Sequence, residues 1–147
     1  MKELIDNLFS VDSNLAYSSL KELLSLSEKS SDVYQFFDTF AMMLDNKNSY
    51  VRTRGILLIA ANAQWDLDNK INKIIDKFLL YTADEKPITS RQCILSLENI
   101  VKNKKELILP IKQRLLSPFY VKYATNMQSL IRRDCEKILT IISTIEK

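Results

Sequence analysis

The nine residues from 51 to 59 read VRTRGILLI, and the chain returns to their pattern twice, as TSRQCILSL at residues 89–97 and as IRRDCEKIL at residues 131–139. Each copy has a small residue four positions after its first member and a large aliphatic residue eight positions after it. The small residues are Gly55, Cys93 and Cys135. This spacing places both kinds of residue on the buried side of a helix.

A weaker copy begins at Leu15, with Ser19 and Leu23 at the same offsets. The four copies start 36, 38 and 42 residues apart. Helical self-similarity at such a period is typical of stacked helical hairpins, in which each hairpin covers the apolar side of the next. The sequence therefore predicts an all-α fold, an α-α superhelix or solenoid of about four helical hairpins, as a single domain over residues 1–147.

Apolar residues at helical spacing predict eight helices along the chain. Their approximate ranges are 4–9, 15–26, 33–44, 49–63, 71–79, 88–101, 107–116 and 127–145. Asn48 or Ser49 is expected to cap the fourth helix, and Pro87 suits the first turn of the sixth. Ser117 is expected to end the seventh helix, because the residue before a proline avoids the α region.

Gly55 is the only glycine and lies inside the fourth helix, where glycine costs about 1 kcal/mol relative to alanine. The other copies also carry small residues at this position, so we interpret it as a point where two helix axes approach closely. Cys93 and Cys135 occupy the same position in neighbouring repeats. Adjacent helices lie farther apart than the ~7 Å limit for a disulfide, so two buried, reduced thiols are expected.

The composition excludes several classes of protein. The chain has 147 residues, of which 46% are apolar and 27% charged, with one glycine and three prolines. These values indicate a globular domain with few sharp turns, which argues against a β-sandwich or barrel. No apolar run reaches the ~18 residues that a membrane span needs, and residues 1–10 do not resemble a signal peptide. A cytoplasmic protein without membrane contact is expected.

The net charge of +3 is unevenly distributed. Residues 1–85 hold nine basic and thirteen acidic side chains, a balance of −4, whereas residues 86–147 hold twelve and five, a balance of +7. A basic half can indicate an anionic partner. It can equally be a solvated surface that keeps the protein soluble.

The inner helices of the predicted hairpins resemble those of HEAT repeats, which often begin with an acidic turn followed by Val-Arg. The segments 48–52 (NSYVR) and 131–132 (IR) carry the resemblance, and Asp45 lies near the expected turn acid. The segment 107–111 (LILPI) is similar to an outer helix that tolerates proline. The second copy departs from the pattern, because Thr89-Ser90 replaces Val-Arg. The resemblance covers residues 12–145 and implies that the α-α superhelix is an armadillo/HEAT-like solenoid.

The whole chain is also similar to small bacterial HEAT-like proteins, some of which carry a SufBD label after iron–sulfur assembly scaffolds. The segments that carry this likeness are 52–63 with 65–66, and 86–93. The chain has no histidine and no clustered cysteines, so we expect no cofactor of that kind.

Residue types that most enzymes need are missing. Without histidine there is no catalytic triad, and two separated cysteines cannot build a four-thiolate metal site. One glycine cannot supply a phosphate-binding loop or a dinucleotide fingerprint. Acid pairs such as Asp84-Glu85 fall in turns, where carboxylates usually cap helices. The sequence predicts no enzyme, no metal and no catalytic residue.

The candidate partner-binding residues are five arginines and one tryptophan. They are Arg52, Arg54, Arg91, Arg132, Arg133 and Trp65. Arginine on an inner surface can grip a carboxylate or phosphate with two parallel contacts. The competing interpretation is an intramolecular ladder with turn acids such as Asp45 and Asp84. Trp65 is either an anchor for a partner or the half-buried edge of the core.

Binding of a protein or peptide on the concave face is the function that these patterns favour. Nucleic-acid binding through the basic C-terminal half is the alternative, since some HEAT-like proteins repair alkylated DNA with tryptophans and an aspartate, to which Trp65-Asp66 is similar. HEAT-like phycobilin lyases are a third comparison, but no residue set supports that activity. The oligomeric state stays open.

Overall fold

The computed structural model describes all residues from 1 to 147 and contains eight α-helices and no strand. The helices are α1 (Lys2–Asn7), α2 (Ser13–Lys29), α3 (Phe37–Met43), α4 (Ser49–Ala61), α5 (Lys70–Leu80), α6 (Pro87–Asn103), α7 (Ile108–Leu116) and α8 (Thr125–Glu146). Short 3₁₀ turns at Asp32–Phe36, Ala63–Trp65, Tyr81–Ala83, Lys105–Leu107 and Phe119–Lys122 adjoin them. The predicted all-α class and the order of the eight helices are confirmed.

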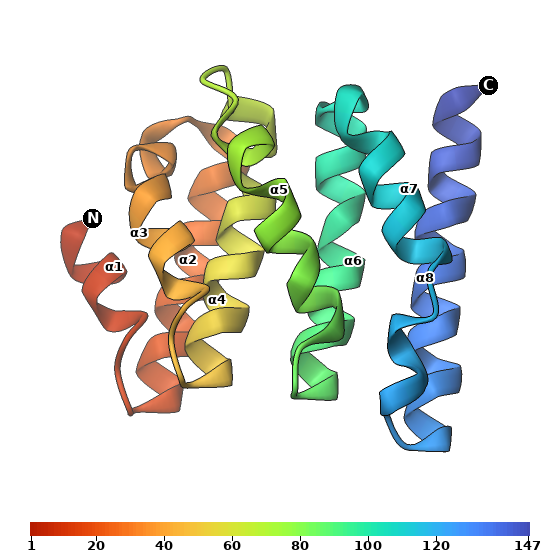
Figure 1. Ribbon diagram of the computed structural model, residues 1–147. Coiled ribbons are helices and arrows are strands. Elements are labelled where there is room, and N and C mark those ends of the chain that lie inside the picture. Colours follow the sequence, from red (N-terminus) through yellow and green to blue (C-terminus); the bar gives the residue numbers. More distant parts are fainter.

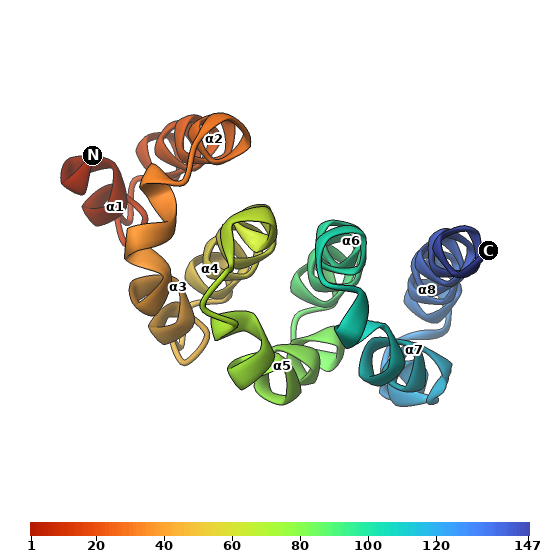
Figure 2. The same cartoon turned by 90° about the horizontal axis from the view of Figure 1, so that it is seen from above.

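The helices form two layers (Figures 1 and 2). One row contains α2, α4, α6 and α8, in which each helix contacts the next, and the other contains α1, α3, α5 and α7. Seen from above, the first row lies on the inside of the bend that the molecule makes between α2 and α4 (Figure 2). We call it the inner row and the other the outer row.

Local signals at the helix ends match those expected from the sequence. Asn48 caps α4 by accepting from the N–H of Tyr50, and Pro87 occupies the first turn of α6. Ser117 ends α7 in an extended conformation. Asn69 precedes α5 with φ 56°, in the left-handed region that asparagine tolerates better than most residues. Because these residues begin or end helices within a few positions, short connections lead the chain from one row to the other.

Gly55 marks a close approach between α4 and α3. A Cβ atom built on it would lie 2.8 Å from Met43 Cβ and 2.9 Å from the Phe40 carbonyl oxygen, both in α3. Neither atom belongs to a flexible side-chain end, so only glycine fits without a shift of the helices. The predicted close-approach role is confirmed, with α3 as the partner helix.

The apolar core lies between the two rows and runs without interruption from Ile5 to Ile142. Phe37, Phe40 and Phe78 are its largest fully buried side chains. Helix α4 is buried on most sides, whereas α8 leaves a polar face to solvent, as a helix at the end of the row must. No helix is long and apolar enough to cross a lipid bilayer.

Candidate functional site

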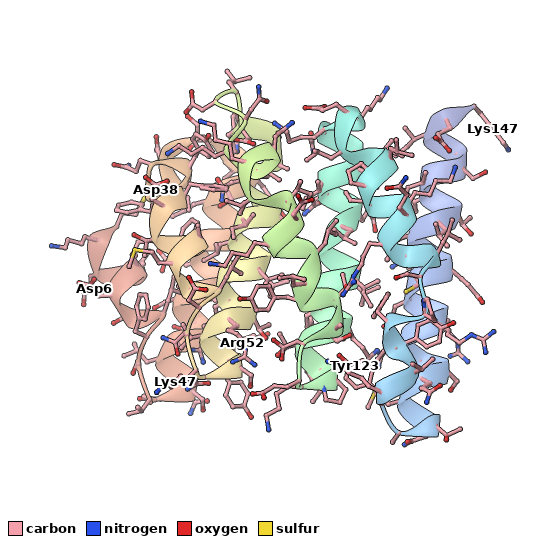
Figure 3. All side chains as sticks on the ribbon, in the orientation of Figure 1. Asp6, Asp38, Lys47, Arg52, Tyr123 and Lys147 are labelled. Carbon is pink, nitrogen blue, oxygen red and sulfur yellow. The ribbon has the colours of Figure 1, made fainter.

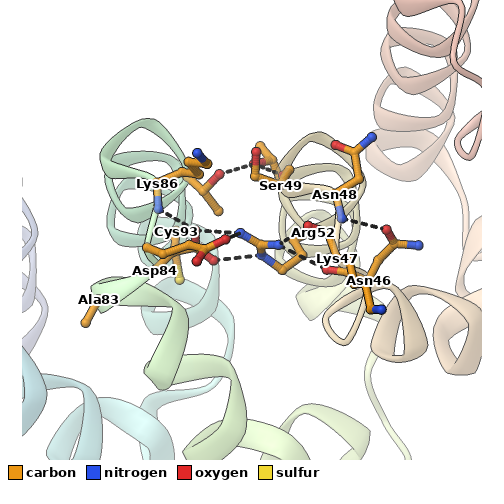
Figure 4. Close-up of polar contacts among 12 residues, drawn as sticks. Asn46, Lys47, Asn48, Ser49, Arg52, Ala83, Asp84, Lys86 and Cys93 are labelled. Atoms are coloured by element: carbon orange, nitrogen blue, oxygen red, sulfur yellow. Dashed lines mark hydrogen bonds and ion pairs between the residues drawn. The ribbon is translucent and has the colours of Figure 1, made fainter.

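Arg52 is enclosed at the beginning of α4 and bonds only within the chain (Figures 3 and 4). Its Nε and Nη2 atoms each donate to one carboxylate oxygen of Asp84, both at 2.8 Å. Its Nη1 atom donates to the carbonyl oxygens of Asn46 and Lys47, each at 3.0 Å. The hydrogen bonds to Asp84 raise the pKa of Arg52 in spite of its burial. This two-pronged contact holds the turn before α4 against the turn before α6.

Asp84 accepts hydrogen bonds from three residues, Arg52, Lys86 and Tyr123. Its side chain is 3% exposed and also accepts from the N–H of Lys86, at 2.9 Å, in the turn that leads into α6. Its carbonyl oxygen accepts from the hydroxyl of Tyr123. The competing interpretation, an arginine paired with a turn acid of the same chain, is therefore confirmed for Arg52 and Asp84. Asp45 takes no part in it, because it pairs with Lys77 in α5 at 2.7 Å.

Arg91, in the next helix of the inner row, is also paired with a carboxylate. Its Nε atom lies 2.7 Å from the Asp134 carboxylate in α8, and Nη2 adds a second contact at 3.2 Å. The hydrogen bond to Asp134 raises the pKa of Arg91, whose side chain stays 34% exposed. Arg132 and Arg133 lie on the exposed side of α8 with no carboxylate within 4.0 Å. The structure thus separates the five candidate arginines instead of gathering them into one patch.

Arg54 differs from the other buried basic side chains. It is 8% exposed, and its Nη1 atom donates to the Leu8 carbonyl oxygen at 2.8 Å. No carboxylate lies within ion-pair distance of it, whereas the buried Arg52 and Lys104 each have two. Burial lowers the pKa of Arg54.

Trp65 is half-buried and joins two helices of the inner row. Its indole N–H donates to the Ser27 carbonyl oxygen at 2.7 Å, and the Gln64 side chain donates to the same oxygen at 3.2 Å. Both bonds fasten the end of α4 to the end of α2. The polar atom of the indole is therefore engaged inside the chain, which fits the core-edge interpretation of this residue.

Beside these bonds the inner row is hollowed by a groove of about 340 Å³ between α2, α4 and α6. We call it the inner groove. Its lining residues are Leu24, Glu28, Leu57, Ala60, Ala61, Gln64, Ser96, Asn99 and Asn103. Four of them form an apolar floor, and the others carry a carboxylate, three amides and a hydroxyl. No arginine or tryptophan predicted from the sequence lines it.

The groove could not be predicted from the sequence, because each helix contributes only a few residues of common types to its lining. Leu57 and Ala61 are one turn apart on α4, and Asn99 and Asn103 are one turn apart on α6. Partly exposed apolar residues at this spacing on one helix, beside amides on the next, are the signal that could have found it. A mixed apolar and amide surface can contact an extended peptide through both its side chains and its main chain.

A buried polar cluster near α5 was also missed. The Asp66 carboxylate accepts from the Tyr34 hydroxyl at 2.6 Å, from the N–H groups of Lys70 and Ile71 at 2.9 Å, and from Lys104 Nζ at 3.0 Å. Desolvation raises the pKa of Asp66, but these hydrogen bonds together outweigh it, so the pKa lies below its usual value. The cluster is enclosed and has its hydrogen bonds satisfied within the chain, so it stabilises the fold.

The remaining reactive side chains are enclosed. Cys93 and Cys135 are buried and free, as predicted. Desolvation by burial raises the pKa of Cys93, and it raises that of Cys135 to about 12. No group of three or more carboxylates and thiols is placed to hold a metal ion.

The comparisons add no relative to this description. No protein-family model, curated protein or solved structure matches the chain. A function must therefore be argued from the geometry of the inner row.

Proposed function

We propose that the chain is a short HEAT-like α-solenoid that binds an extended peptide segment of a protein partner in the inner groove. The observation that carries the proposal is the composition of that groove, an apolar floor bordered by amide, hydroxyl and carboxylate groups from three successive helices. Apolar floors with a few placed polar groups are typical of binding sites.

The solenoid part of the proposal is supported by the spacing of polar contacts. Bonded pairs of side chains recur at separations of 32 to 43 residues, and five pairs between residues 34 and 114 lie 32 residues apart. The pairs are Tyr34–Asp66, Asp38–Lys70, Asp45–Lys77, Arg52–Asp84 and Thr82–Arg114. Equal separations are expected when each hairpin packs on the next by the same step.

The position of the groove also fits an extended peptide. Its lining comes from three successive helices of the inner row, whereas the hollow lined by α5 and α7 lies on the outer row. Leu57 and Ala61 keep partial exposure there, although the other aliphatic side chains of α4 are buried. Covering this surface by a partner is favourable by about 25 cal/mol for each Å² removed from water.

Selection from a random peptide library displayed on phage tests the proposal. Enriched peptides are expected to lose at least about tenfold in affinity, roughly 1.4 kcal/mol, when Ala61→Arg fills the groove. Thr140→Arg is the matched control, because it adds the same side chain to an exposed position of α8. Equal binding by the wild type and Ala61→Arg would show that the groove is not the site.

Nucleic-acid binding remains the second candidate function. The observation that favours it is the exposed side of α8, where Arg132, Arg133 and Lys137 have no ion-pair partner. Other basic side chains of the C-terminal half, such as Arg91, are paired within the chain. A gel-shift assay at about 50 and 200 mM salt tests this candidate, since phosphate contacts weaken steeply with salt. No retention of duplex or single strand at the lower salt would exclude it.

A further inference from the structure

The free hydrogen-bonding atoms of the inner groove are mostly acceptors. The Gln64 side chain donates from Nε2 to the Ser27 carbonyl oxygen at 3.2 Å. Asn103 donates from Nδ2 to the Asn99 carbonyl oxygen at 2.8 Å. Because a carbonyl oxygen only accepts, these bonds assign the orientation of both amides and leave Oε1 of Gln64 and Oδ1 of Asn103 without a donor in the chain.

The one hydroxyl of the lining is also engaged as a donor. Ser96 Oγ donates to the Cys93 carbonyl oxygen at 2.7 Å, so its lone pairs are the part that remains free. The free donors of the lining are one N–H of Gln64, one of Asn103 and the amide of Asn99. The free acceptors are the oxygens of the three amides, the hydroxyl oxygen and both oxygens of a carboxylate. A ligand that brings donors therefore finds more partners here than one that brings acceptors.

Glu28 supplies that carboxylate and is the single charged side chain of the lining. It is exposed and takes part in none of the ion pairs of the chain. The adjacent Lys29 does not line the groove, and Lys102 in α6 pairs with Glu98 at 2.5 Å. The groove thus carries a carboxylate for which the chain supplies no counter-charge.

Three helices end beside the groove and add negative partial charge. Glu28 is the last residue but one of α2, Ala61 is the last of α4, and Asn103 is the last of α6. The unpaired carbonyl groups of a final turn give a helix C-terminus up to about half of an elementary negative charge. A cation is therefore stabilised by its surroundings in this groove, and an anion is not.

From this charge and from the excess of acceptors we propose that the inner groove selects a peptide segment with an arginine or lysine side chain, whose cationic group pairs with Glu28. The apolar floor, which includes Leu24 and Leu57, covers the aliphatic part of that side chain. A segment rich in carboxylates is rejected at the same place by repulsion from Glu28. The inference rests on the proposed function, because it names the residue type that the bound peptide carries.

Two blocked tripeptides that differ only in charge test the inference. Acetyl-leucyl-arginyl-leucine amide is the cationic probe, and the same peptide with citrulline in place of arginine is neutral and of nearly equal shape. Each is titrated into ¹⁵N-labelled protein while the side-chain amide resonances of Gln64, Asn99 and Asn103 are followed. Asn126, an exposed residue outside the groove, is the internal control. The arginine peptide is expected to bind about threefold to fivefold more tightly, the upper range for an exposed ion pair.

Glu28→Gln should remove that difference in affinity. Glu22→Gln, the same change at an exposed position of α2 outside the lining, should leave it in place. Equal affinities of the two peptides for the wild type, or a difference that survives Glu28→Gln, would overturn the inference and leave the groove as a peptide site. Absence of a saturable shift with the arginine peptide would also overturn it, while selection on Ala61→Arg still decides the proposed function.

Discussion

Removing one partner of the Arg52–Asp84 pair should destabilise the protein strongly. The two side chains are 8% and 3% exposed and share two hydrogen bonds of 2.8 Å. Arg52→Met leaves a buried carboxylate, and Asp84→Asn leaves a buried guanidinium. Either change is expected to lower the free energy of unfolding by about 3–5 kcal/mol, the usual cost of breaking a buried ion pair.

The double variant separates the pair from its surroundings. Arg52→Met/Asp84→Asn leaves no buried charge, so its cost should fall below the sum of the single costs by about 2–3 kcal/mol. Some loss remains, because Arg52 also donates to the carbonyls of Asn46 and Lys47. Urea unfolding followed by circular dichroism measures all three variants, and an unchanged slope confirms that only stability has changed.

The control is Arg132→Met, which removes an exposed and unpaired arginine and should change stability by less than about 0.5 kcal/mol. If Arg52→Met costs no more than this control, or if the single costs simply add, Arg52 is not a structural partner of Asp84. It would then be free for an external anion, as the binding interpretation of the arginines requires.

Three further outcomes are expected. Because the pKa of Asp66 is lowered in the folded protein, its carboxylate contributes stability above its unfolded pKa near 4, and this stability is lost as the pH falls through the folded pKa. The free energy of unfolding of Asp66→Asn should therefore decrease less steeply with falling pH than that of the wild type. An equal decrease in both proteins would contradict this. Gly55→Ala should lower the midpoint of urea unfolding. Helix propensity improves by about 1 kcal/mol, but overpacking against Met43 costs about 1–3 kcal/mol. A raised midpoint would show that α3 can move away from α4. Cys93 and Cys135 should react with a thiol reagent at pH 8 only as fast as the protein unfolds, since burial raises both pKa values; rapid labelling in native buffer would argue against that enclosure.

Those parts of the structure that depend on one helix at a time could be predicted from the sequence. Apolar spacing located all eight helices, and local signals such as Asn48 and Pro87 located several of their ends. Gly55 was interpretable because three copies of one pattern share a small residue at its position. These features depend on contacts within a turn or on a repeated demand for close packing, both of which leave a pattern in the chain.

The candidate site could not be predicted in the same way, because it depends on how three helices are placed. Leu24, Leu57 and Asn99 line one groove although they come from three helices, α2, α4 and α6, that are distant in the sequence. The arginines drew attention by residue type, but Arg52 and Arg91 find carboxylates 32 and 43 residues further along the chain. Residue type indicates what a side chain can bind, whereas only the packing decides whether a partner is already present.

A contact spacing of 32 residues is the link between sequence and packing in this molecule. It is shorter than the 36 to 42 residues that separate the pattern copies, because bonded residues face each other across adjacent hairpins and do not occupy equivalent positions. Each such pair is satisfied in one relative placement of two hairpins. A slip by one turn would leave Arg52 and Asp84 buried and unpaired, at the cost given above. We infer that the buried Arg52–Asp84 pair helps to fix how the helices on either side of it pack together.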